Sequence, residues 1–335
     1  MSYKNLCLNR ICTGATLVSA LALSSCQPGR NFYVIEELRV PALQVLQQQD
    51  SQSDQNRCVE IDGAQLCQQY PLRFGKNVVF KFLAIAPDRT EPVSLRLTRL
   101  QRAKLAQPLS PTAGCLEIFN AVQTRTFEEV PLAQLGLSDT PITASVKQES
   151  PMRVEEHTAS FSAPAQSVVE SDLAASGYLP LFQVEYEASS GSLRPDRGYF
   201  TFAFVSELPA SASNDQKCLA YLYTGSVPTS LAAAASGMGP DVTNKAPYIK
   251  ALSPTQDAVV SGSPQELKLE FERPDTDTDA KQRIQWYISR GELENKGAAS
   301  TKLTFSGSEP LTAVGIVRDL QGGVDFAWST FTAQP

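Results

Sequence analysis

Strict alternation of apolar and polar residues is the feature that most limits how this chain folds. Residues 267–272 (Leu-Lys-Leu-Glu-Phe-Glu) place every second side chain on one apolar side, and the same period recurs in residues 284–289 and 324–328. A period of two is that of a half-buried β-strand. Strands at regular spacing, joined by Pro, Gly and Asp turns without long helices, are typical of an antiparallel β-sandwich. We therefore expect an all-β fold.

Strand-like segments also occur in the first two thirds of the chain. They cover residues 32–45 (interrupted by Pro41), 77–86, 93–100, 179–188, 198–205 and 219–224. Residues 103–175 are rich in Pro, Ser and Thr and predict a long irregular insertion with one short helix near 130–135. Residues 227–245 lose all periodicity, as linkers do. We expect a first sandwich in residues 32–226 and a second in residues 246–335.

Three segments of the second sandwich carry a resemblance. They are Ala246-Pro-Tyr-Ile, Gln285-Trp-Tyr-Ile-Ser and Val317-Arg-Asp-Leu-Gln-Gly-Gly-Val-Asp-Phe. Together they resemble the immunoglobulin-like modules, of polycystic-kidney-disease or fibronectin type, in Gram-negative envelope lipoproteins. The resemblance covers residues 246–335 and implies a disulfide-free sandwich with Trp286 in its core. We expect Asp319 to cap the turn at Gly322 and Gly323, and Arg318 to pair with an acid on a neighbouring strand.

The start of the chain has the pattern of an export signal. Lys4 and Arg10 precede an uncharged segment that ends at residue 25, which is shorter than the roughly 20 apolar residues a spanning helix needs. The segment closes on Leu23-Ser24-Ser25-Cys26, which resembles the lipobox of bacterial lipoproteins. The resemblance implies a signal peptide over residues 1–25, a Cys26 carrying diacylglycerol and palmitate chains, and a tether over residues 26–31. A plain signal peptide with a chance cysteine is the alternative.

Charge and sorting signals indicate where the chain resides and what it binds. Loss of residues 1–25 leaves 27 of the 29 Lys and Arg residues against 35 Asp and Glu residues. One short basic stretch remains, formed by Arg96, Arg99, Arg102 and Lys104. This acidic balance argues against nucleic acid or anionic lipid as a partner. Gln27 follows Cys26, and the sorting rule of enteric bacteria then implies the outer membrane, with the protein facing the periplasm or the cell surface.

The seven cysteines fall into three groups if residues 1–25 are a signal peptide. Cys7 and Cys12 leave with it, Cys26 takes the lipid, and Cys58, Cys67, Cys115 and Cys218 remain. An even number in an oxidising compartment predicts disulfides, with three pairings available. Residues 58–67 form a candidate hairpin with a turn at Asp62-Gly63, so we expect Cys58–Cys67 and, from the remainder, Cys115–Cys218. A metal site is the alternative, but thiolate sites usually use closer pairs or histidine.

Groups able to do chemistry are few. His157 is the only histidine and lies in a polar Glu-Glu-His-Thr stretch, which favours a solvated loop. Glu155 and Glu156 would point to opposite faces of a strand and cannot act as an acid/base pair. Asp275, Asp277 and Asp279 are a candidate calcium loop, but Ala280 and Trp286 stand where an EF-hand needs Gly and Glu. We therefore expect no metal and an acidic loop that solubilises the end of the sandwich.

The sequence indicates a binding or structural role rather than catalysis. No nucleophile elbow, Walker loop or zinc-protease motif is present. The leading hypothesis is a non-enzymatic, membrane-anchored envelope lipoprotein that acts as a scaffold or docks a protein partner, without a cofactor. A surface-exposed adhesive or glycan-binding lipoprotein is the alternative, and an enzyme of unfamiliar type is the third.

Overall fold

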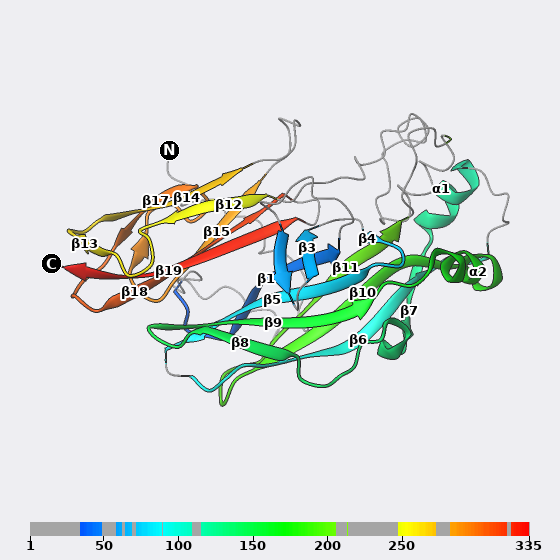
Figure 1. The fold of residues 1–335 in the computed structure, drawn as a ribbon, viewed down its shortest axis with the longest axis horizontal. Helices are drawn as coiled ribbons and strands as arrows, with labels where there is room; N and C mark the ends of the chain where they lie inside the picture. Colours follow the sequence, from blue (N-terminus) through cyan, green and yellow to red (C-terminus); the bar gives the residue numbers. More distant parts are fainter. Residues whose placement is uncertain are drawn as a thin grey trace, which may run out of the picture. The chain divides into compact units, whose positions relative to one another are not determined.

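The structure, a computed structural model, describes part of the chain. The described residues are 34–48, 58–61, 64–68, 72–88, 90–108, 115–205, 213, 247–272, 282–319 and 323–334 (Figure 1). They all belong to one compact unit, Tyr33–Pro335. Several predictions concern residues outside these ranges: lipidated Cys26, the strand at 219–224 with Cys218, the linker at 227–245, and Asp275, Asp277 and Asp279.

The first sandwich has two sheets. The first runs β2 (Cys58–Ile61), β3 (Ala64–Gln68), β1 (Arg39–Gln48), β5 (Asn77–Pro87), β9 (Met152–Ser162) and β8 (Thr143–Gln148). The second runs β4 (Leu72–Arg73), β11 (Asp196–Val205), β10 (Tyr178–Ser189), β6 (Ser94–Lys104) and β7 (Thr126–Val130). Among the described strands of this sandwich, the short β4 alone pairs in parallel, with β11. Helices α1 (Cys115–Gln123) and α2 (Gln166–Ser176) and the 3-10 helix η2 (Leu132–Leu135) fill connections between strands.

The second sandwich also has two sheets. One runs β12 (Tyr248–Ser253), β14 (Gln265–Glu272), β17 (Ser300–Thr304) and β16 (Glu292–Leu293). The other runs β13 (Val259–Ser261), β19 (Val324–Gln334), β18 (Pro310–Arg318) and β15 (Arg283–Ile288). Here too one short strand, β13, pairs in parallel with the last strand.

Both sandwiches have the strand order of an immunoglobulin fold. Its seven strands, lettered A to G, form one sheet in the order A-B-E-D and another of C, F and G. The order β12-β14-β17-β16 opposite β15-β18-β19 reproduces this arrangement. The order β1-β5-β9-β8 opposite β6-β10-β11 reproduces it again. The prediction of all-β, antiparallel, immunoglobulin-like sandwiches is confirmed by this topology.

The prediction of a long irregular insertion over residues 103–175 is wrong for most of that stretch. It contains β8 and β9, which are strands D and E of the first sandwich, and β9 pairs along its full length with β5. The additions to the fold are smaller: α1, η2 and α2, and the hairpin β2–β3 that extends the first sheet beyond β1. The expected short helix near 130–135 is confirmed as η2.

Aromatic rings fill the first core. Alternation along β11 turns Phe200, Phe202 and Phe204 toward β5 and β10, where Phe202 meets Phe80 with ring centroids 5.1 Å apart and Phe182 at 5.6 Å. Phe80, Phe182, Phe202 and Phe204 are almost completely buried. Offset and edge-on pairs of this kind stabilise a core beyond the area that they bury.

Trp286 anchors the second core, as expected. It lies on β15, which is strand C, with 1% of its surface exposed. Its Nε1–H donates to the carbonyl oxygen of Ala298 at 2.8 Å, so the buried indole leaves no donor unpaired. Gly315 of β18 lies beneath the ring, and a Cβ there would approach Leu269 Cδ1 to 2.9 Å and Trp286 Cζ3 to 3.2 Å. The indole of Trp286 can therefore pack here because residue 315 has no side chain.

Candidate functional site

The hairpin β2–β3 carries the one predicted disulfide that the structure tests. Cys58 and Cys67 are opposite each other in the ladder and are bonded, as predicted. Cys115 begins α1, while Cys218 lies outside the described residues, so the pair Cys115–Cys218 stays a prediction. The bridge ties an added hairpin to itself, and three residue pairs then join that hairpin to β1.

The prediction that His157 is a solvated loop residue is wrong. His157 is fully buried in the middle of β9, on the face that looks into the first core. Its Nε2 is 3.1 Å from Glu155 Oε2, and Arg153 Nε donates to Glu155 Oε1. Glu156 points to the opposite face, where Lys81 Nζ is 3.0 Å from its Oε1, as expected from strand geometry.

Three neighbours keep the buried Glu155 carboxylate ionised. Burial opposes its charge, but hydrogen bonds from His157, from Arg153 and from the backbone N–H of Val93 outweigh burial and hold the pKa of Glu155 below its usual value. An ionised carboxylate only accepts hydrogen bonds, so His157 Nε2 carries the proton that it donates. Arg153, Glu155 and His157 are all buried, and the hydrogen bonds between them stabilise β9 inside the first sandwich.

The basic stretch on β6 is paired with carboxylates. Arg96 contacts Glu187 at 3.0 Å, Arg99 contacts Glu129 at 2.8 Å, Arg102 contacts Asp172 at 2.5 Å and Lys104 contacts Glu128 at 2.9 Å. Arg102 is also almost fully buried, which its place in a charged run does not suggest. Each cation of the stretch thus has its own acidic neighbour.

An apolar joint connects the two sandwiches. The outer face of β1, β5 and β9 packs against the outer face of β15, β18 and β19. The first sandwich contributes Ile35, Ala42, Leu83, Ile85, Met152 and Val154, and the second contributes Tyr287, Val314, Ile316, Val324 and Phe326. Each of these side chains is at most 8% exposed. Contacts between domains that move are usually more polar, so this joint holds the sandwiches in one arrangement.

Hydrogen bonds also connect the two sandwiches beside the apolar cluster. The Gln148 amide donates to Thr312 Oγ1 and accepts from Thr330 Oγ1, both at 2.5 Å, which ties β8 to the second sandwich. The backbone N–H of Ile35 donates to Ile288 O at 3.1 Å, which adds the segment before β1 to the edge of β15. The joint is thus closed by hydrogen bonds as well as by apolar contact.

Asp325 is a half-buried charged group at the joint. Its Oδ1 accepts from Gln44 Nε2 of β1 at 2.8 Å and from the Phe326 N–H at 2.9 Å, and its Oδ2 accepts from the Ile249 N–H at 2.7 Å. Burial nevertheless dominates and raises the pKa of Asp325 to about 6. The carboxyl therefore couples the joint to pH.

Among the described residues, Arg318 pairs with no acid, contrary to expectation. It donates to Gln285 Oε1 at 3.0 Å and to the carbonyl oxygen of Pro41, which are both neutral. Burial lowers its pKa. Asp319 behaves as predicted, because its Oδ1 accepts from the Gly323 N–H at 2.9 Å and closes the turn, whose Gly322 lies outside the described residues.

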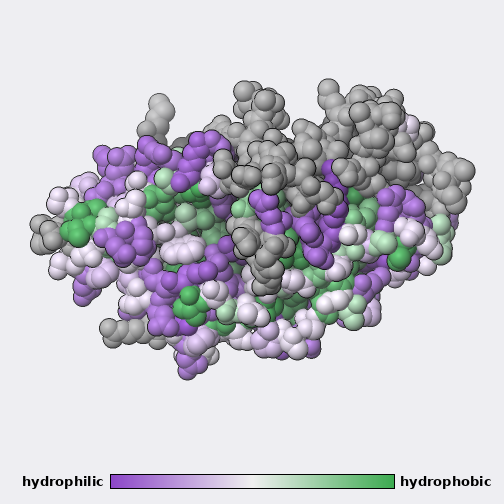
Figure 2. All heavy atoms as spheres, viewed as in Figure 1, coloured by the Kyte–Doolittle hydropathy of each residue, from purple (hydrophilic) through white to green (hydrophobic). Residues whose placement is uncertain are grey.

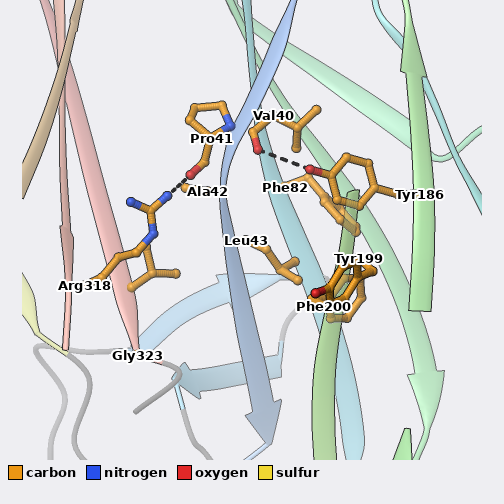
Figure 3. A pocket seen from close by; sticks show the side chains of 11 residues that line it. Val40, Pro41, Ala42, Leu43, Phe82, Tyr186, Tyr199, Phe200, Arg318 and Gly323 are labelled. Carbon is orange, nitrogen blue, oxygen red and sulfur yellow. Dashed lines mark hydrogen bonds between the residues drawn. The ribbon is translucent and has the colours of Figure 1, made fainter. Parts of the chain in front are cut away.

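A cavity of about 330 Å³ lies beside β1, next to Arg318 (Figure 3). Its walls come from residues 40–43 of β1, from Phe82 of β5, and from Tyr186, Tyr199 and Phe200 of β10 and β11. Arg318, Gly323 and Val324 of the second sandwich complete it. The β1–β5 pairing is irregular between Arg39 and Ala42, next to the cavity. Pro41 lies in this interval and has no N–H to donate to the ladder.

Comparison with known proteins provides no family. No family model matches the chain, and no curated protein matches it. Among solved structures, the N-terminal Ig1-2 module of the Drosophila receptor protein tyrosine phosphatase DLAR is 8% identical, with a TM-score of 0.24, and covers 80% of this chain and 95% of its own. The fibronectin(III)-like modules of Clostridium thermocellum CbhA are 10% identical, with a TM-score of 0.23, and cover 79% and 90%. TM-scores this low establish no relationship, and the fold is assigned from the strand order.

In the part of the chain that the structure describes, no three His, Cys, Asp or Glu side chains are grouped to hold a metal ion. No helix among the described residues is both long and apolar enough to cross a membrane.

Sequence reasoning missed the joint and its polar residues, although one signal was available. Residues 311–317 and 77–86 are apolar almost without interruption. Such runs indicate strands buried on both faces. In the structure one face of β18 and of β5 lies in its own core and the other lies in the joint.

Proposed function

We propose that this chain is a non-enzymatic envelope lipoprotein, anchored in the outer membrane through acyl chains on Cys26. Its two sandwiches serve as a rigid scaffold that holds a protein partner at a fixed position relative to the membrane. The anchor rests on the Leu23-Ser24-Ser25-Cys26 pattern, since three acyl chains give stable binding where one does not.

The apolar joint is the observation that carries the scaffold role. A flexible pair of modules would place a partner anywhere within reach of its linker, whereas a buried, hydrogen-bonded joint gives one orientation. The apolar cluster and the Gln148, Thr312 and Thr330 contacts form such a joint.

The described surface favours a polar docking face. Large apolar side chains that are exposed are scattered on it, namely Val146, Val168, Tyr199 and Val259. In the view of Figure 2 the green residues form small separate areas among purple and white ones. A partner would therefore bind through hydrogen bonds and charge pairs rather than through one large apolar patch.

Lipid labelling tests the anchor. The full chain, expressed in a Gram-negative host with an alkyne analogue of palmitate, is expected to take up label and to fractionate with the outer membrane. Cys26→Ala should lose both properties, while Cys12→Ala is the matched control and should keep both, because Cys12 leaves with the signal. An unlabelled wild-type chain would contradict the anchor.

Recovery from solubilised membranes tests the scaffold. The wild-type chain should bring down a partner protein at a fixed ratio. Val314→Asp, which places a charge in the joint, should keep the lipid and lose the partner. A chain that is recovered alone, or a partner that is retained by the Val314→Asp variant, would contradict a scaffold role without affecting the anchor.

A further inference from the structure

We propose that the cavity beside β1 binds a small organic acid, a carboxylate attached to an aromatic or aliphatic body. The cavity measures about 330 Å³, which is near the lower end of the range for ligand pockets. The proposal concerns a site that the scaffold role does not use, so either one can fail without the other.

The apolar wall is built from packed rings. Phe82 meets Phe200 with ring centroids 5.7 Å apart and Tyr186 at 5.6 Å, while Leu43 lies across from them (Figure 3). Rings that brace one another in this way hold the wall in place before a ligand arrives, and a preformed wall reduces the cost of binding.

Gly198 makes room for one of these rings. It is the cross-strand partner of Tyr186, and a Cβ at Gly198 would approach the Tyr186 Oη to 2.5 Å. The Tyr186 hydroxyl donates only a long hydrogen bond, of 3.5 Å, to Val40 O. A phenol is protonated at neutral pH, and burial raises the pKa of Tyr186 further, to about 12. The hydroxyl can therefore turn from this long hydrogen bond and donate to a ligand oxygen.

Arg318 supplies the charge that selects an acid. Both of its hydrogen-bond acceptors, Gln285 Oε1 and Pro41 O, are neutral. No carboxylate of the described residues lies within ion-pair distance of it, whereas Arg96, Arg99, Arg102, Arg153 and Arg197 each have one. A half-buried guanidinium beside an apolar cavity therefore retains an unneutralised charge. Carboxylate is the group whose two oxygens match its planar fork.

The surroundings set the orientation of the ligand. Asp196 accepts from the Val40 N–H at 2.6 Å and so adds a negative charge near the β1 wall. A carboxylate is therefore expected at the Arg318 side, with the apolar body against the partly exposed Leu43 and Phe200. Tyr199, which is 67% exposed, lies at the edge of the cavity and can cover the bound body.

Calorimetric titration of the full chain with 3-phenylpropionate and with its amide, 3-phenylpropionamide, tests the proposal. The two ligands share size and ring, and differ in charge. We expect the acid to bind with a dissociation constant of about 1 mM and the amide at least about tenfold more weakly. Equal binding of the two, or no saturation by the acid at about 10 mM, would overturn the proposal.

Two variants locate the site. Arg318→Met should remove the preference for the acid, whereas Arg290→Met should leave it unchanged, because Arg290 lies in the same sandwich but bonds to Ser306 and Glu309 instead. If Arg318→Met keeps the preference, the acid binds elsewhere and the assignment is wrong. Far-ultraviolet circular dichroism checks that each variant folds, and the acid–amide comparison on the wild-type chain decides the matter if one does not.

Discussion

At the scale of single residues, buried carboxyl groups make the stability of this chain depend on pH. Asp325 has a pKa of about 6 in the fold against an ordinary 3.8, so between these values the folded chain binds more protons than the unfolded chain. The free energy of unfolding therefore falls as pH rises through this window. The full effect corresponds to about 3 kcal/mol. Glu155 acts in the opposite direction, because its lowered pKa makes stability fall as pH drops below its ordinary range.

The Asp325 contribution can be isolated with Asp325→Asn. Urea unfolding of the wild-type chain at several pH values from about 4 to 7 should show stability declining as the pH rises, and the variant should show a flatter profile. The slope rather than the absolute stability is the readout, because an amide loses one of the acceptors that Ile249, Gln44 and Phe326 use. Identical slopes in the two proteins would contradict the raised pKa of Asp325.

Glu155→Gln should be strongly destabilising. Removing the charge leaves the buried Arg153 without its buried carboxylate partner, and breaking a buried pair in this way costs about 3–5 kcal/mol. Glu149→Gln is the matched control, because Glu149 is 3.9 Å from the same arginine but its side chain is 74% exposed. Exposed pairs contribute about 0–1 kcal/mol. Similar unfolding free energies for the two variants would argue against the buried network.

At the scale of strands, the core of the second sandwich depends on how closely β18 approaches Trp286. Gly315→Ala should destabilise the chain by about 1–3 kcal/mol, because the added methyl group overlaps Leu269 and the indole. Gly297→Ala adds the same methyl group where the nearest atom is 3.9 Å away and should be close to neutral. Thermal unfolding of the two variants compares them directly, and equal effects would mean that β18 does not lie against the ring.

The strands that were predictable from sequence are those with one buried face. Residues 267–272 alternate because one side of β14 meets the core and the other meets solvent. β19 begins with the same alternation, but its apolar side chains Val324 and Phe326 lie in the joint. β9 escaped prediction because both of its faces hold charged groups, a buried network around Glu155 and lysine partners around Glu156. No local pattern distinguishes such a strand from a polar loop, since its partners come from β5, from β8 and from the segment before β6.

The cavity was beyond sequence reasoning for a different reason. It is formed by β1, β5, β10, β11, β18 and β19, and the chain brings these together only through two complete sandwiches and the joint. Arg318 was singled out, but its neutral acceptors, one of them 277 residues away in sequence, follow from that packing alone.

At the scale of the whole molecule, the joint makes the two sandwiches one unit. Two sandwiches that share a buried apolar layer should unfold together, since separating them would expose the apolar side chains of the joint to water. Val314 lies fully buried in that layer, and Val314→Asp places a charge there at a cost of about 3 kcal/mol or more. Val146→Asp is the same change at a site on β8 that is 45% exposed, and it should have little effect.

Differential scanning calorimetry of the wild-type chain and these two variants tests the joint most directly. We predict one cooperative transition for the wild-type chain and for Val146→Asp, and two separate transitions for Val314→Asp as each sandwich unfolds alone. Two well-separated transitions in the wild-type chain, or a Val314→Asp profile identical to it, would contradict a rigid two-sandwich unit.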